Sequence, residues 1–275
     1  MPEYFLYFYI FIFGLAAGSF LNCVIYRLEL SEDTGSRPGK KSFSFLRGRS
    51  FCPHCKHNLS WPDLIPVLSF IALRGKCRYC QKPISWQYPL VEIATGALFV
   101  LIFNQFPALS FLSIIYYWVI FSLLVAIFVF DLKRFIIPDE IIFPAIGVAL
   151  FYHLFQIAGI ARVGPVHIME FFYSAIGAAA FFLAIVLVSR GRWMGAGDIK
   201  LAFFMGLFLG WPNILAALFL AFLTGALLGI GLIALGRKTL KSEVPFGPFL
   251  ITGTFLALFY GERIISWYLG LFLPV

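Results

Sequence analysis

Two aspartates at the edges of long apolar runs are the residues of this sequence best suited to chemistry. Asp131 ends the run in "VAIFVFDLKRFIIPDE", and Asp198 precedes the run in "GDIKLAFFMGLFLG". Ionisable groups at the edge of a membrane span are costly and mark functional sites. The helix dipole disfavours a charge on Asp131, at a helix C-terminus, and favours one on Asp198, at a helix N-terminus. Two carboxylates in unlike environments can share a proton and activate a water molecule, the chemistry of peptide-bond hydrolysis.

The residues around Asp198 allow a functional and a structural interpretation. Gly195 and Gly197 precede it, and glycines let a substrate backbone approach closely, so both are candidate substrate-binding residues. The structural alternative makes Asp198 an N-terminal cap or first-turn acid. Asp139 and Glu140, which follow a proline at a predicted helix start, fit that structural role well.

Four of the five cysteines form two CxxC pairs, Cys52 with Cys55 and Cys77 with Cys80, inside one polar segment. Each pair can chelate from a tight turn, and four thiolates complete a closed structural zinc site. Redox chemistry or two disulfides are the alternatives, but a reducing cytoplasm argues against disulfides. The pattern therefore predicts a Zn²⁺ ion that staples a segment too small to build much core of its own.

Three further residues that could bind metal or react are interpreted as having no functional role. His54 and His57 could replace a thiolate as zinc ligands, but they are interpreted as surface histidines of a loop. Cys23 lies in the first apolar run and is interpreted as a small apolar residue.

The elements that must position these groups are membrane-spanning helices. Of the 275 residues, 61% are hydrophobic and 12% charged, far fewer charges than the roughly 25% of a typical soluble domain. The predicted fold is an all-α polytopic membrane protein with about eight transmembrane helices. The sixth predicted span is short unless its helix begins near the glycines before Asp198. The predicted spans are Tyr4–Tyr26, Tyr88–Phe106, Phe111–Phe130, Ile136–Ile157, Ile168–Ser189, Ile199–Gly210, Asn213–Leu235 and Pro248–Leu271.

Basic residues give the orientation of these spans. Loops on one side hold 19 of the 21 Lys and Arg residues, and only Arg162 and Arg263 fall elsewhere. The positive-inside rule places that side in the cytoplasm. The same asymmetry accounts for the net charge of +8, so no nucleic-acid partner is expected. The chain then divides into a first transmembrane helix (1–26), a cytoplasmic four-cysteine segment (27–87) whose stretch 29–50 is predicted to be a loop, and a seven-helix membrane-embedded domain (88–275) that carries both aspartates.

Taken together, these motifs resemble the bacterial prepilin peptidases, also called type IV leader peptidases. "GAGDIK" is similar to the GxGD signature of intramembrane aspartyl proteases, and "DLKRFIIPD" and the four-cysteine segment occur with it in the family's order. The segments "GSFLNCVIYRL", Cys52–Glu92 and "PFGPFL" match as well, so the resemblance covers nearly the whole chain.

The resemblance implies a membrane endopeptidase that removes the basic leader of prepilins and pseudopilins. It also implies N-methylation of the new N-terminus with S-adenosylmethionine as the methyl donor. The catalytic pair of the family falls on Asp131 and Asp198, and its zinc ligands fall on the four cysteines. The expected location is the bacterial inner membrane, multi-pass and surrounded by lipid, with the active site facing the cytoplasm. The residues that bind the methyl donor are not assigned, because no glycine-rich nucleotide loop follows a strand.

Two rival functions come from other classes. A proton-coupled transporter could use the same carboxylates, but transporters place their sites near the bilayer midplane. In this sequence, the acidic residue predicted to lie deepest in a span is Glu92, one turn into the second predicted span. A zinc-scaffolded assembly factor without catalysis would leave the pairing of Asp131 and Asp198 unexplained.

Overall fold

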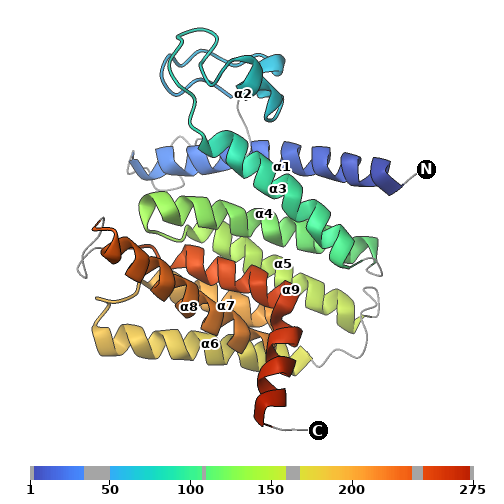
Figure 1. Ribbon diagram of the computed structural model, residues 1–275, viewed down its shortest axis with the longest axis vertical. Helices are drawn as coiled ribbons and strands as arrows, with labels where there is room; N and C mark the ends of the chain where they lie inside the picture. Colours follow the sequence, from blue (N-terminus) through green and yellow to red (C-terminus); the bar gives the residue numbers. More distant parts are fainter. Residues whose placement is uncertain (1–2, 34–49, 107–109, 159–167, 237–243, 273–275) are drawn as a thin grey trace. The chain divides into compact units, whose positions relative to one another are not determined.

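The computed structural model describes residues 3–33, 50–106, 110–158, 168–236 and 244–272 (Figure 1). These residues form helices and turns, with two isolated β-bridges and no β-strand. The helices are α1 (Glu3–Asp33), η1 (Trp61–Leu64), α2 (Leu68–Ala72), α3 (Gln87–Gln105), α4 (Phe111–Arg134), α5 (Asp139–Ile157), α6 (Ile168–Ser189), α7 (Ala196–Leu209), α8 (Asn213–Ala234) and α9 (Gly247–Phe272).

The first helix is longer than its apolar run. α1 continues through the polar residues 27–33, where the sequence predicted the start of a loop. The remainder of that predicted loop, 34–49, lies outside the described residues, as does Arg162. A helix that is already formed in the membrane extends readily into a short stretch of good helix formers such as Leu28, Glu29 and Leu30.

The chain separates into two compact units. Unit 1 comprises residues 1–109 and 117–126, and so contains α1, the four-cysteine segment, α3 and the middle of α4. Unit 2 comprises residues 110–116 and 127–275, and so contains both ends of α4 and helices α5 to α9. The four cysteines belong to unit 1, and both candidate aspartates belong to unit 2.

In unit 1, α1 packs against α3 at very short range. A Cβ atom on Gly14 would lie 2.6 Å from Cα of Gly96, and one on Gly18 would lie 2.7 Å from Cα of Glu92. Gly14 and Gly18 are four residues apart on one helix face, the spacing that lets membrane helices approach backbone to backbone. This close crossing fixes the position of Glu92 beside α1.

In unit 2, α7 is enclosed by its neighbours. Every residue from Leu201 to Leu209 is buried except Phe203, which is partly exposed. α6 contacts α7 extensively, and a Cβ on Gly206 would collide with the backbone of Ser174 and Ala175. An apolar helix of 14 residues that neighbours surround on all sides is a core helix, and it need not span the bilayer.

The described residues contain seven helices long and apolar enough to cross a membrane, and the protein is a multi-pass membrane protein. Seven of the eight predicted spans correspond to these helices. The sixth, predicted at Ile199–Gly210, corresponds to α7, which begins among the glycines before Asp198 and, with 14 residues, is not one of these seven. Many large apolar side chains on the spans remain exposed, as expected for surfaces that face lipid.

Candidate active site and metal-binding cluster

Asp131 lies in the last turn of α4 and is only 4% exposed. The helix ends four residues later, where Phe135 adopts a left-handed conformation and its N–H donates to the Asp131 carbonyl. The carboxylate points to another helix, since Oδ2 accepts a hydrogen bond of 3.0 Å from the N–H of Gly247. Gly247 is the first residue of α9. The carboxylate at the C-terminus of one helix is thus stabilised by the N-terminus of another.

Gly247 lies in the "PFGPFL" segment of the resemblance, but its contact with Asp131 was not predicted from the sequence. A Cβ atom at this position would lie 2.5 Å from Oδ2 of Asp131, so no side chain fits without moving the carboxylate. The signal in the sequence was the order Gly247–Pro248, because glycine and proline are common at the start of a helix. The prediction that the helix dipole disfavours a charge on Asp131 considered only the C-terminus of α4. The N-terminus of α9, which also faces this carboxylate, has the opposite effect.

Asp198 lies in the first turn of α7 and is partly buried. Its Oδ2 accepts a hydrogen bond of 3.1 Å from the N–H of Gly195, and its own N–H bonds to the Gly195 carbonyl. The carboxylate therefore does cap its helix, as the structural interpretation expected. Capping occupies one oxygen only: among the described residues, Oδ1 of Asp198 and Oδ1 of Asp131 have no hydrogen-bond partner.

The two carboxylates lie close enough for the charge of Asp198 to act on Asp131. The link between α4 and α5 brings them together, because Ile137 in that link is buried against the start of α7. A Cβ on Gly197 would lie 3.1 Å from Cβ of Ile137, so the contact is already tight. Unit 2 thus assembles the ends of three helices, α4, α7 and α9, around two carboxyl groups.

α7 is tied to α5 at both ends. Near its N-terminus, Lys200 forms an ion pair with Asp139 in the first turn of α5. Near its C-terminus, the buried His153 of α5 donates through Nε2 to the Leu207 carbonyl, at 2.9 Å. Asp139 and Glu140 begin α5 directly after Pro138, which confirms their predicted place in a first helical turn. These ties fix the axial position of α7 and hence the place of its carboxylate.

The two glycines before Asp198 differ in their surroundings. Gly197 is packed against Ile137, as described above, so its small size serves the fold. A Cβ on Gly195 would meet no atom closer than 3.9 Å, and its φ of −86° suits any residue. Of these two glycines, Gly195 is the one with open space beside the Asp198 carboxylate, among the residues that the structure describes.

In unit 1, the four cysteines form one cluster. The Sγ atoms of Cys52, Cys55, Cys77 and Cys80 all lie within 4.8 Å of one another, and the group can hold a metal ion. Cys52 and Cys80 are 3.9 Å apart, while tetrahedral Zn–S bonds of about 2.3 Å place sulfurs about 3.8 Å apart. All five cysteines are free thiols. Burial alone would raise the pKa of Cys52, but N–H groups of Cys55 and His54 and the neighbouring thiols lower it to about 7.

The cluster is built from two equal turns. Cys52 donates its N–H to the His57 carbonyl, and Cys77 donates to the Lys82 carbonyl five residues on in the same way. Lys56 and Gln81, at matching positions, both take a positive φ. The ring of His57 packs against that of Tyr79 at a tilt of 34°, with centroids 3.7 Å apart, and the metal-binding group comprises the four cysteines without this histidine.

An acid outside the cluster joins the two turns. Asp63 in η1 accepts from Arg78 Nε at 2.8 Å and from Ser60 Oγ at 2.7 Å, and its side chain is 2% exposed. Arg78 lies between the second pair of cysteines. Because η1 follows the first turn and Arg78 belongs to the second, this carboxylate holds the two halves of the segment together.

Glu92 attaches the four-cysteine segment to the helices of unit 1. Its Oε2 accepts a hydrogen bond of 2.8 Å from the N–H of Val67, which precedes α2 and adopts a φ of 60°. A β-branched residue rarely tolerates a positive φ, so the buried carboxylate stabilises a strained position. Glu92 thus has a structural role, which leaves the transporter hypothesis without a midplane acid among the described residues.

Known proteins match both parts of the chain. Residues 12–106 match the bacterial peptidase A24 N-terminal domain, and residues 118–230 match the type IV leader peptidase family. Three similar proteins are each named prepilin leader peptidase/N-methyltransferase. That of Aeromonas hydrophila is 35% identical over 96% of this chain and 94% of its own length. Those of Bacillus subtilis and Legionella pneumophila are 33% and 31% identical over 94% and 97% of this chain, each covering 96% of the relative.

No solved structure matches the chain significantly. The relatives, by contrast, align over almost their full length, including the four-cysteine segment and the region of both aspartates. The chain therefore belongs to the type IV leader peptidase family, as its motifs predicted.

Proposed function

We propose that this protein is a membrane aspartyl endopeptidase that removes the leader of type IV prepilins and pseudopilins and then methylates the new N-terminus. Family membership supports both activities, since relatives that cover the whole chain carry both in their names. The convergence of Asp131 and Asp198 at three helix ends is the observation that carries the peptidase assignment. A noncatalytic assembly factor would have no use for two neighbouring carboxyl groups with free oxygens.

The proposed reaction needs one proton shared between the two carboxyl groups. Oδ2 of each aspartate is held by a backbone N–H, of Gly247 or of Gly195, which fixes the direction of Oδ1. The ionised aspartate takes a proton from a water molecule while the other, protonated, donates to the scissile carbonyl oxygen. The water attacks, the tetrahedral intermediate collapses, and a proton passes to the leaving amine. No covalent enzyme intermediate forms.

The substrate reaches this pair, in our proposal, over Gly195. Within the described part of the chain, a Cβ at that position would meet only Gly197 and Asp198 within 4 Å. A substrate with a polar leader and an apolar helix can hold its helix beside the spans, which brings the junction to the depth of the carboxylates. Gly197 supports this arrangement indirectly, by letting α7 pack against Ile137.

For the cluster in unit 1 we propose structural Zn²⁺ held by the four cysteines. Four thiols at tetrahedral spacing fit zinc, which would lock the two turns together. S-adenosylmethionine would supply the methyl group for N-methylation. We further propose that 1–26 anchors the chain, 27–87 is the cytoplasmic metal-stapled segment, and 88–275 is the protease domain. The basic residues support an inner-membrane protein with its carboxylates at the cytoplasmic face.

A prepilin peptide incubated with the purified full chain in detergent tests the proposal. Mass spectrometry should show loss of the leader, followed by a gain of one methyl group when S-adenosylmethionine is present. Unchanged substrate mass with folded protein would overturn the peptidase assignment. Cleavage without methylation would overturn only the second activity.

Gly195→Val tests the proposed approach of the substrate. The backbone conformation suits valine, and no described residue is displaced, so the thermal unfolding temperature should stay within a degree or two of wild type. Cleavage should fall by roughly 10²-fold because the side chain keeps the scissile bond away from Asp198. Gly229→Val, on α8 with no atom within 4 Å of a Cβ, is the control for bulk in open space. Equal cleavage by Gly195→Val and wild type would show that the substrate does not pass this position.

A further inference from the structure

Arg263 is an arginine that the proposed reaction does not use. It lies on α9, follows Gly247 by 16 positions, and is one of two basic residues outside the predicted cytoplasmic loops. Sixteen residues correspond to about 24 Å of helix, a distance close to the roughly 30 Å hydrocarbon core. Arg263 is therefore near the membrane edge opposite the carboxylates. Within the described part of the chain it makes no ion pair, although it is exposed.

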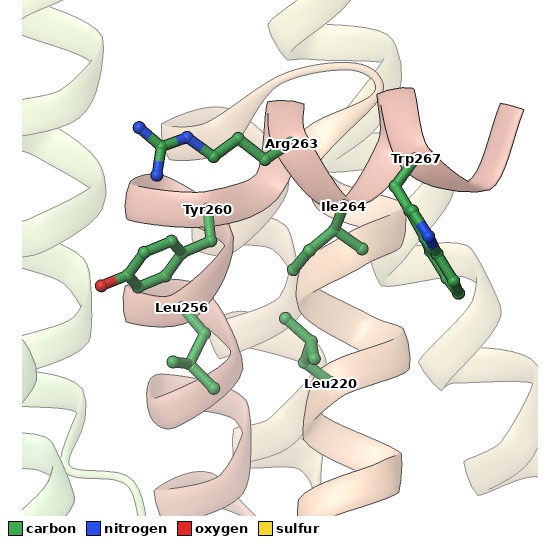
Figure 2. A pocket seen from close by; sticks show the side chains of 6 residues that line it. All are labelled: Leu220, Leu256, Tyr260, Arg263, Ile264 and Trp267. Carbon is green, nitrogen blue, oxygen red and sulfur yellow. The ribbon is translucent and has the colours of Figure 1, made fainter. Parts of the chain in front are cut away.

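A change of direction in α9 opens a groove beside this arginine. Figure 1 shows α9 changing direction in its second half, and Figure 2 places the bend between Tyr260 and Arg263. A Cβ on Gly261 would lie 2.5 Å from Oδ1 of Asn213, so the glycine allows α9 to pass close to the start of α8. Beyond that contact the two helices leave a groove of about 370 Å³. Its lining residues are Leu220, Leu256, Tyr260, Arg263, Ile264 and Trp267.

The groove combines an apolar floor with an amphipathic rim. Leu220, Leu256 and Ile264 form its floor, while the Arg263 side chain and the Tyr260 hydroxyl extend to the same side (Figure 2). Trp267 closes the other end and is 67% exposed. Tyr and Trp are enriched where membrane proteins meet the headgroup layer, and arginine binds phosphate with several parallel N–H donors.

We propose that this groove binds one phospholipid molecule, with an acyl chain on the apolar floor and the phosphodiester at Arg263. Charge complementarity favours a lipid over a second protein as the occupant. The floor of the groove is apolar, and Arg263, the one cationic lining residue, requires an anion at the depth of the lipid headgroups. The groove volume of about 370 Å³ lies in the range of pockets that bind small molecules, roughly 300–1,000 Å³. An apolar helix of a protein partner would cover the floor but leave the guanidinium unpaired.

Native mass spectrometry of the purified full chain tests the site. The probes are dioleoyl phosphatidylglycerol and the matching diacylglycerol, which lacks the phosphate. Wild type should retain one phosphatidylglycerol at low lipid concentration and should bind diacylglycerol much more weakly. Arg263→Gln should weaken phosphatidylglycerol binding about tenfold, because a charge-assisted contact is lost. Glu262→Gln, the exposed neighbour on the same helix, is the matched control and should bind as wild type does.

A second measurement locates the bound molecule. Phosphatidylglycerol with a photoreactive group on its acyl chain should label peptides of α8 and α9 in vesicles, and Leu220→Trp should reduce that labelling by filling the groove. Equal retention by wild type and Arg263→Gln, or labelling spread evenly over all spans, would overturn the proposal. Displacement of the labelled lipid by a prepilin helix with no dependence on Arg263 would equally overturn it, in favour of a protein occupant.

Discussion

The two sites of this protein are built in opposite ways. The four cysteines lie between positions 52 and 80, and short turns bring them together, each closed by hydrogen bonds over a few residues. The carboxylate site draws on Asp131, Asp198 and Gly247, which lie on three helices of unit 2. One site is made by local backbone geometry, and the other by helix packing.

The difference predicts how each site fails. A local cluster loses its metal when its own ligands change, and few distant residues matter to it. A site made by packing is sensitive to any residue that sets the position of a helix end. Gly247 and Gly197 are such residues, because each permits a contact that a methyl group would prevent or tighten.

The largest effect should come from the carboxylates themselves. Asp131→Asn and Asp198→Asn should each lower cleavage by about 10³-fold or more, because general acid–base catalysis is lost and the pair can no longer share a proton. Both variants should keep the metal content of unit 1 and still insert in the membrane. The measurement is the initial rate of leader removal. Near-normal rates in either variant would remove that residue from the mechanism.

A methyl group at Gly247 should be nearly as damaging, although it changes no ionisable group. The Cβ would lie 2.5 Å from Oδ2 of Asp131, so Gly247→Ala must push the carboxylate out of place. A misplacement of about 1 Å costs roughly 10²-fold in rate. Gly229→Ala, on a helix with open space around it, is the control and should cleave normally. A fully active Gly247→Ala enzyme would contradict the assembly of the site by helix packing.

Loss of the metal should affect cleavage less than either change above. Cys52→Ser combined with Cys55→Ser leaves two thiols, too few for a closed tetrahedral site. Purified wild type should carry about one zinc ion per chain, and the double variant none. Hydrogen exchange across 50–84 should accelerate, whereas cleavage should fall by less than about tenfold, because sites with no shared partners behave independently. A loss of cleavage as deep as that of Asp131→Asn would show that the two sites are coupled.

The contrast between a locally formed site and one formed by helix packing also explains which features could be predicted from the sequence. The cysteine cluster could be predicted from spacing alone, because the two cysteines of a CxxC pair are brought together by a single short turn. Seven spans also followed, since an apolar run of about 20 residues has one stable arrangement in a bilayer. For α7, hydropathy predicted the apolar helix but not its surroundings, because hydropathy does not distinguish a helix that faces lipid from one that other helices surround.

The contacts between packed helices could not be predicted from the sequence, because they join residues far apart in the chain. The hydrogen bond between Asp131 and Gly247 joins positions 116 residues apart, and no local pattern encodes it. The dipole argument for Asp131 was incomplete for that reason: it included the end of α4 but not the start of α9. The separate roles of Gly195 and Gly197 likewise depend on where Ile137 lies.

The smallest predicted effect compares one ion pair from each unit. Asp63 pairs with Arg78 while its own side chain is 2% exposed, whereas Asp139 pairs with Lys200 while 53% exposed. An exposed pair contributes little, so Asp139→Asn should change stability by less than about 0.5 kcal/mol. Asp63→Asn should weaken the four-cysteine segment by about 1 kcal/mol, because a charged acceptor in a network is lost. Hydrogen exchange of 60–84 at neutral pH measures the second effect.

The pH dependence of that difference has a definite sign. Burial alone would raise the pKa of Asp63, but hydrogen bonds from Ser60 and Arg78 and the charge of Arg78 lower it below its usual value. A carboxyl group with a lowered pKa stabilises the folded state fully above its unfolded pKa, about 4, and loses that contribution as the pH falls through the lowered value. Wild type and Asp63→Asn should thus differ in exchange at neutral pH and converge in acid. A difference that grows on acidification would mean that Asp63 acts through something other than its charge.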